Sequence, residues 1–209
     1  ELNHRPPIKD IVFDVGRVLI DFRYDALFRY FKENGTRIDS VHDFVEKTDL
    51  KAYEYGHIST EAYLDNLSAL FDRPVNREEL TSKWVRIFEP VTEMLAWAAS
   101  LKRDYGVYLL SNTSALHWDY LISEYRIDEV GFGLLASFEV GAVKPEEAIF
   151  RAAEKRFGLS PGRTLFIDDL QENVRGAIDS GWRGIHHVSI KETQGLVKTL
   201  LGLPSTPTA

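Results

Sequence analysis

The hydrophobic pattern divides the chain into two parts. Between residues 21 and 90, apolar residues recur three and four positions apart, and Ser40, Ser59 and Asn76 stand where helix N-caps are expected. No stretch of this part has the pattern of a strand. The sequence therefore predicts an all-helical block of about 70 residues, folded as a small bundle.

Strands and helices alternate in the rest of the chain. Apolar runs predict strands at residues 11–13, 107–110, 134–138, 164–167 and 184–188. Helical spacing separates these runs, with Pro145 expected in the first turn of a helix that ends at Gly158. This order predicts an α/β fold, in which helices cover both faces of a parallel sheet.

The helical block interrupts this α/β pattern after its first strand. Residues 1–20 and 91–209 are expected to form the α/β core domain, and residues 21–90 an inserted helical domain. The insertion begins beside polar residues at the end of the first strand, which favours a lid over a functional site. A plain structural insertion is the alternative.

Polar side chains follow three of the predicted strands. In chain order they are Asp14, then Ser111, Asn112 and Thr113, then Asp168 and Asp169. Lys144 adds a cation before a helix. Because parallel strands end at one edge of a sheet, these groups are expected to converge there. Neighbouring carboxylates repel one another, so they indicate a shared hard cation, for which Mg²⁺ is the natural choice.

The same residues predict phosphate chemistry. Ser111, Thr113 and Lys144 would hold a phosphoryl group, which leaves Asp14 as a carboxylate nucleophile. Each motif alone also has a plainer interpretation. Asp14 and Gly16 favour a turn, the other strand-end residues favour helix caps, and a lone lysine is most often at the surface.

Composition narrows the class of protein. The 209 residues carry 25 basic and 32 acidic side chains, a net charge of −7, which argues against a nucleic-acid-binding surface. Cysteine is absent, so disulfides and thiolate sites are excluded. No apolar run is long enough to span a membrane and no signal peptide is evident, so a cytoplasmic protein is expected, as a monomer or weak homodimer. A loose tail is expected at residues 204–209.

Four segments together resemble the motifs of the haloacid dehalogenase-like (HAD) superfamily. They are FDVGRVLID, LLSNT, VKPEEAIF and FIDDLQENVRGA, in the order and along the span of that family. The resemblance implies a Rossmann-like core with a helical cap where the block is inserted. The segment AYEYGHIS in the block is similar to a cap segment of bacterial sugar-phosphate phosphatases, of the α-D-glucose-1-phosphate phosphatase type.

The resemblance also implies roles for single residues. Asp14 matches the nucleophile that forms an aspartyl-phosphate, and the carbonyl of Gly16 matches a metal ligand. Ser111 and Asn112 match the phosphate-binding residues, and Lys144 matches the lysine that neutralises nucleophile and phosphate. Asp169 matches the Mg²⁺ carboxylate, with Asp168 beside it and Asn173 as a supporting residue. The resemblance does not say which of the two aspartates contacts the metal first.

One position departs from the family. Most of its phosphatases carry a second aspartate two residues after the nucleophile, as the acid that protonates the leaving group. Gly16 occupies that position here, as in the glucose-1-phosphatase type, and cannot donate a proton. Candidates for the missing role are Asp21, Glu54 and His57; water, or a good leaving group such as an anomeric oxygen, are the other possibilities.

Five residues of the helical block are candidates for recognising the substrate. They are Tyr53, Glu54, Tyr55, His57 and Trp84. His57 is equally compatible with a solvated loop and Trp84 with the apolar stripe of its helix.

These observations predict a Mg²⁺-dependent phosphatase of a small phosphate ester, such as a sugar phosphate. One alternative is a 2-haloacid dehalogenase that uses Asp14 without metal, although Asp168 and Asp169 argue against it. The other is a regulatory module that binds phosphate and turns over weakly.

Overall fold

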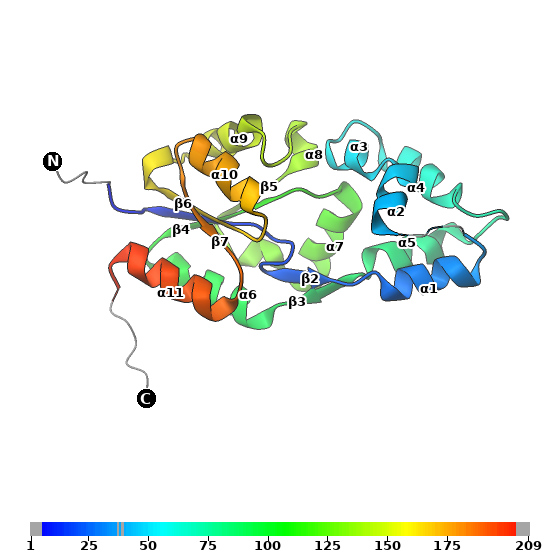
Figure 1. The fold of residues 1–209 in the computed structure, drawn as a ribbon, viewed down its shortest axis with the longest axis horizontal. Helices are drawn as coiled ribbons and strands as arrows, with labels where there is room; N and C mark the ends of the chain where they lie inside the picture. Colours follow the sequence, from blue (N-terminus) through cyan, green and yellow to red (C-terminus); the bar gives the residue numbers. More distant parts are fainter. Residues whose placement is uncertain (1–5, 37, 39, 204–209) are drawn as a thin grey trace.

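The structure is a computed structural model that describes residues 6–36, 38 and 40–203. The tail expected at residues 204–209 lies outside the described part. Across the described residues, the chain forms a parallel sheet with flanking helices and a separate group of helices at one end (Figure 1).

The main sheet has five parallel strands in the order β5-β4-β1-β6-β7. These strands are β1 (Asp10–Phe13), β4 (Gly106–Ser111), β5 (Gly133–Ala136), β6 (Thr164–Asp168) and β7 (Arg183–His186). All residues of β1 and β6 are buried, as expected for central strands covered on both faces. In register, Phe13 of β1 lies between Leu109 of β4 and Ile167 of β6, so these three strands end together.

Helices pack on both faces of this sheet (Figure 1). On one face lie α6 (Thr92–Ser100), α7 (Ala115–Tyr125) and α11 (Ile190–Leu201); on the other lie α9 (Glu147–Phe157) and α10 (Gln171–Asp179). Alternation along β1 explains the two layers, because Ile11 and Phe13 enter one apolar cluster and Val12 the other. The predicted fold class is confirmed.

The helical block has an apolar core of its own. Its helices are α1 (Asp25–Glu33), α2 (Val41–Thr48), α3 (Leu50–Glu54), α4 (Thr60–Ser68) and α5 (Arg77–Val85). Ser40, Ser59 and Asn76 accept hydrogen bonds from main-chain N–H groups in the first turns of α2, α4 and α5, as predicted. Trp84 and Phe44 are fully buried in this core.

Three details of the predicted pattern are wrong. Two short antiparallel strands, β2 (Ile20–Phe22) and β3 (Phe88–Pro90), lie where the chain enters and leaves the block. Three residues are too few to show alternation in sequence, so no strand was expected there. The run at 134–138 ends as a strand at Ala136 and continues as α8 (Ser137–Val140). Pro145 precedes α9, whose N-cap is Glu146.

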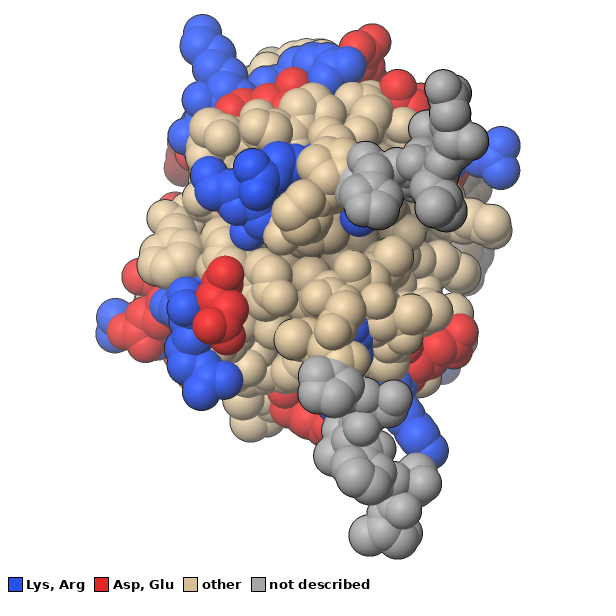
Figure 2. All heavy atoms as spheres, turned by 90° about the vertical axis from the view of Figure 1, so that its left-hand side faces the viewer, with Lys and Arg blue, Asp and Glu red and all other residues tan. Residues whose placement is uncertain are grey.

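Three short 3₁₀ helices complete the elements: η1 (Leu101–Arg103), η2 (Ile127–Glu129) and η3 (Pro161–Arg163). On the face in Figure 2, which is the end of the core away from the helical block, basic and acidic side chains lie close together around uncharged surface. None of the described helices combines the length and apolar character needed to cross a membrane.

Candidate active site

The ends of the central strands bring the predicted polar residues together. Asp14 follows β1, Ser111 ends β4 and Asp168 ends β6. Since β1 pairs with both β4 and β6, the three positions are neighbours at the carboxyl edge of the sheet. The ligand atoms of Asp14, Asp168 and Asp169 all lie within 4.8 Å of one another.

Lys144 is the cation at the centre of this group. Its Nζ lies 2.6 Å from Asp14 Oδ1 and 2.8 Å from Asp168 Oδ2, and it donates a hydrogen bond to the carbonyl of Leu110 at 3.2 Å. Only 4% of Lys144 is exposed, which excludes the surface position considered above. Val15 N–H also donates to Asp14 Oδ1, at 2.7 Å, so this oxygen is held from two sides.

Asn112 fixes the main chain of Lys144. Its side-chain oxygen accepts from Lys144 N–H at 2.8 Å, and its side-chain nitrogen donates to the Lys144 carbonyl at 3.0 Å. These two bonds tie the loop before α9 to the segment that follows β4. The Asn112 amide therefore serves to position Lys144.

Asp168 and Asp169 have different environments. Asp168 is fully buried, and its oxygens accept hydrogen bonds from Lys144, from Asn173 Nδ2 at 3.1 Å, and from Leu170 N–H at 2.8 Å. Asp169 is half-buried and lines the cavity at the sheet edge. Asp168 is saturated by protein donors, whereas Asp169 faces the space that a ligand would occupy.

Burial shapes the charges of this cluster. It raises the pKa of the Asp14 carboxyl, the Lys144 charge lowers that pKa, and Asp168 raises it again. Burial lowers the pKa of Lys144, but the two carboxylates that it contacts raise this pKa by a larger amount. The net shift is upward, so the ammonium form is retained. Burial and Asp168 raise the pKa of Asp169. Three carboxylates face one ammonium group, a deficit of two positive charges that suits a divalent cation with oxygen ligands.

Two adjoining cavities open from this edge. The carboxylate cavity, of about 340 Å³, is lined by Asp14, Arg17, Lys144, Asp169, Leu170 and Asn173 together with the shared residues below. The aromatic cavity, of about 120 Å³, extends between the core and the helical block and is lined among others by Tyr24, Glu54, Trp84, Phe88 and His117. Both cavities share Gly16, Phe22, Ser111 and Asn112, so they are neighbours.

Polar groups lie among the aromatic rings of the aromatic cavity. Burial raises the pKa of Glu54 to about 7 and that of Tyr24 to about 12. Burial lowers the pKa of His117 to about 3, against its hydrogen bond to the carbonyl of Trp84. Trp84 Nε1 is buried without a hydrogen-bond partner among the described residues. This lining suits a small ligand that carries hydroxyl groups.

Some predicted residues lie elsewhere. His57 is exposed, stacks on the ring of Tyr55 at 5.0 Å, and lines neither cavity. Tyr55 donates a 2.5 Å hydrogen bond to Glu146, and Tyr53 is buried against the ring of Tyr63. The structure therefore brings Glu54 to the site and leaves these three neighbours outside both cavities.

The aromatic cavity also holds two residues that the sequence did not single out. Tyr24 lies before α1 and His117 lies in α7, and both look in sequence like members of apolar helical stripes. The position of His117 soon after LLSNT is the only local signal that it belongs near the site.

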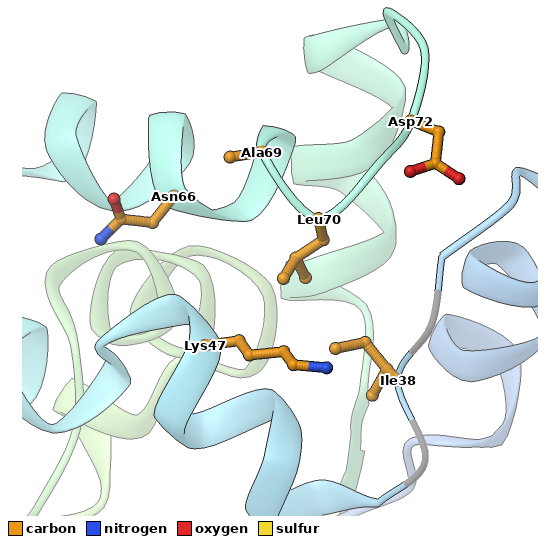
Figure 3. A pocket seen from close by; sticks show the side chains of 6 residues that line it. All are labelled: Ile38, Lys47, Asn66, Ala69, Leu70 and Asp72. Carbon is orange, nitrogen blue, oxygen red and sulfur yellow. The ribbon is translucent and has the colours of Figure 1, made fainter.

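A further pocket lies within the helical block (Figure 3). Its volume is about 380 Å³, and its lining comes from Ile38, Lys47, Asn66, Ala69, Leu70 and Asp72. It shares no residue with either cavity at the sheet edge.

Comparisons with known proteins place the chain in a family of hydrolases. The model of the haloacid dehalogenase-like hydrolase family matches residues 8–181. D-ribitol-5-phosphate phosphatase from Bacteroides thetaiotaomicron is 30% identical over 179 residues, which cover 80% of this chain and 85% of that protein.

Solved structures with a similar fold are also HAD-family enzymes. A HAD-family enzyme from Bacteroides thetaiotaomicron superposes with a TM-score of 0.82 at 26% identity, over 92% of this chain and 99% of that one. A structure of that enzyme in complex with magnesium and inorganic phosphate gives 0.79, at 26% identity over 90% and 98% of the two chains. A predicted HAD-like hydrolase from Porphyromonas gingivalis gives 0.75, at 29% identity over 92% and 99%.

Proposed function

This chain belongs to the haloacid dehalogenase-like hydrolase family, and from this premise we propose that it is a Mg²⁺-dependent phosphatase of a sugar or sugar-alcohol phosphate. The observation that carries the proposal is the cluster of Asp14, Asp168 and Asp169 around the buried Lys144, at the mouth of a cavity lined by Ser111.

The donor set suits Mg²⁺. Asp14, Asp169 and the main-chain carbonyl of Gly16 would hold the ion, because Asp168 is already bound by Lys144, Asn173 and a main-chain N–H group. When bound, the ion supplies positive charge to the phosphoryl oxygens and to the carboxylates around it. Asp168 instead orients Lys144.

The protein groups then perform a two-step transfer. Asp14 attacks phosphorus and forms an aspartyl-phosphate as the bond from phosphorus to the ester oxygen breaks and the alcohol leaves, while Lys144 and Ser111 bind the oxygens of the phosphoryl group. Water next attacks phosphorus and releases inorganic phosphate, which restores the Asp14 carboxylate. The guanidinium group of Arg17, which stacks 4.1 Å from the ring of Phe22, lies at the same cavity and offers a further positive charge.

The substrate class is supported by the aromatic cavity and by one relative. The cavity, of about 120 Å³, has room for a compact leaving group, and Glu54 in its lining offers a hydrogen-bonding group to the hydroxyls of that group. A relative that covers most of this chain acts on D-ribitol 5-phosphate by its name. We assign residues 21–90 as the cap that contacts this leaving group, with residues 1–20 and 91–209 as the core.

The proposal is tested by measuring phosphate release from a panel of sugar and sugar-alcohol phosphates, with Mg²⁺ and with EDTA. We expect Mg²⁺-dependent release that Asp14→Asn abolishes, because an amide is a poor nucleophile. Asp104→Asn, which alters an exposed aspartate, is the matched control and should keep the activity.

Other outcomes identify the alternatives. Binding of esters without turnover would favour the regulatory module. Chloride release from 2-chloropropionate in EDTA would favour the dehalogenase, although carboxylates crowded around Asp14 give a metal-free site no benefit.

A further inference from the structure

Hydrolysis of an alkyl phosphate requires a proton for the leaving oxygen, because an alkoxide is a strong base. Gly16, the residue two positions after Asp14, has no proton to give. Among the described residues that line the two cavities, the carboxyl groups are those of Asp14, Asp169 and Glu54. Asp14 is the proposed nucleophile and Asp169 would hold the cation, which leaves Glu54.

We infer that Glu54, a residue of the helical block, is the general acid and base of the reaction. The inference rests on the proposed phosphatase function and adds to it the group that handles the leaving-group proton.

The proton and electrons balance over the two steps. When Asp14 Oδ bonds to phosphorus, the bond from phosphorus to the ester oxygen breaks and its electron pair stays with that oxygen. The Glu54 carboxyl gives its proton to the oxygen and becomes a carboxylate, and the alcohol leaves. Glu54 then takes a proton from the water that attacks phosphorus, the bond to Asp14 breaks, and both carboxyl groups return to their starting forms.

Contacts between block and core hold Glu54 in place. Ser137 Oγ donates to the Glu54 carbonyl at 2.6 Å and accepts a hydrogen bond from Thr113 N–H at 3.0 Å. Thr113 belongs to the segment that supplies Ser111, so the main chain of Glu54 is linked through one hydroxyl to the predicted phosphate-binding segment. In the described part of the chain, no donor binds the Glu54 carboxyl group, which is therefore available to a ligand.

The surroundings of Glu54 keep a proton on it near neutral pH. Burial raises the pKa of Glu54 to about 7, and Lys51 of the same helix opposes this shift. The groups that face it from other elements are Tyr24 and Tyr63, with His117 in the same cavity. Burial raises the pKa of both tyrosines and lowers that of His117 to about 3, so all three are neutral when Glu54 titrates.

The other two candidates for this role lie outside the cavities. Asp21 alternates along β2 with Ile20 and Phe22, which line the aromatic cavity, so its side chain points away from it. His57 is exposed and stacks on Tyr55.

The test compares Glu54→Gln with wild type on two esters in Mg²⁺. The leaving group of D-ribitol 5-phosphate is an alkoxide, which needs the proton, whereas the leaving group of 4-nitrophenyl phosphate is a stabilised phenolate, which needs it little. We expect the variant to lower turnover of the alkyl ester by about 10²–10⁴-fold and to affect the nitrophenyl ester far less. Wild-type kcat/KM for the alkyl ester should fall above about pH 7, where Glu54 loses its proton, and this fall should be absent in the variant.

Asp21→Asn and His57→Gln are the controls and should leave the ratio of the two rates unchanged. Equal losses on both esters, or no loss, would overturn the role of Glu54 while leaving the phosphatase intact. If wild type hydrolyses neither of these esters and no ester of the sugar-phosphate panel, the proposed function itself fails, and the inference with it.

Discussion

Lys144 joins three parts of the sequence, two through its ammonium group and one through its main chain. It contacts Asp14 at 2.6 Å and Asp168 at 2.8 Å, and Asn112 binds its main chain on both sides. A buried charge is stable only when such partners are present, so each partner depends on the others.

We therefore expect Lys144→Met to destabilise the protein by about 3–5 kcal/mol, because it leaves two buried carboxylates without their cation. Urea unfolding followed by circular dichroism measures this change. Lys32→Met, which removes an exposed lysine from α1, should change the unfolding free energy by less than about 0.5 kcal/mol. A Lys144→Met protein as stable as wild type would show that the pairing contributes little.

His117 makes stability depend on pH. Burial lowers its pKa from 6.5 to about 3 in the folded protein. A folded-state pKa below the unfolded value stabilises the protein above pH 6.5, and this stabilisation is lost as the pH falls toward 3.

Between pH 7 and 5 we expect His117 to contribute a loss of about 2 kcal/mol in the unfolding free energy. His117→Gln keeps a donor for the carbonyl of Trp84 and should remove most of that loss. The comparison is a urea titration of both proteins at the two pH values. An equal loss in the variant would assign the pH dependence to other groups.

Gly16 offers a complementary test of the proton donor. A Cβ atom at Gly16 would meet only a ring carbon of Phe22, at 3.4 Å, so the backbone position accepts a side chain. In a Glu54→Gln background, Gly16→Asp should restore turnover of the alkyl ester by at least about 10-fold, because it places a carboxyl group beside Asp14. Gly16→Asn, of similar shape but without an acidic proton, should not, and an equal gain from Asn would contradict a proton-donor role at this position.

At the scale of elements, α3 and the residues that follow it connect the helical block to the core. α3 packs on α8, Ser137 binds the Glu54 carbonyl, and Leu116 N–H donates to Tyr53 Oη at 3.2 Å. Gly56 follows, with φ +73° and so little space that an added Cβ atom would lie 2.4 Å from the carbonyl oxygen of Phe138. Only glycine permits this approach.

Gly56→Ala should therefore displace the segment that carries Glu54 and lower kcat/KM, by up to about 100-fold if the shift reaches 1 Å. Gly35→Ala is the matched control, since Gly35 also has a positive φ of +83° but open space around it. Both variants place a side chain at a positive φ, but only Gly56→Ala adds the clash with Phe138, so steady-state kinetics should separate them. Similar kinetics for the two variants would mean that the contact with Phe138 does not position the site.

The arrangement of strands and loops also shows which contacts can be predicted from sequence and which cannot. The strand-end residues Asp14, Ser111 and Asp168 could be expected to meet, because parallel strands end at one edge whatever their order. The two hydrogen bonds between the Asn112 side chain and the Lys144 main chain could not be expected, because they join residues 32 positions apart through loop geometry. β2 and β3 were missed because their pairing, and not local pattern, makes them strands.

The sequence left three candidates for the proton donor, and packing separates them. The segment AYEYGHIS indicated a substrate contact, but its local pattern cannot say that Glu54 turns toward the aromatic cavity while His57 turns to solvent. The same limit applies to Tyr24 and His117, whose proximity arises only when the block packs on the core.

At the scale of the molecule, the proposed mechanism takes the nucleophile and the charged groups from the core, and the lining of the aromatic cavity and the proton from the helical block. The block lies at the end of the core where the central strands terminate (Figure 1). In this proposal the leaving group would lie between the block and the core, and the phosphoryl group at the sheet edge. The expected monomer or weak homodimer remains a prediction, and sedimentation would test it.

The central claim is that Asp14 carries the phosphoryl group between the two steps. The most direct measurement is a rapid acid quench of the enzyme during turnover of D-ribitol 5-phosphate in Mg²⁺, followed by mass spectrometry of its peptides. We predict one added phosphoryl group on the peptide that contains Asp14, absent from Asp14→Asn. A phosphoryl group on any other residue, or turnover by Asp14→Asn, would contradict the account.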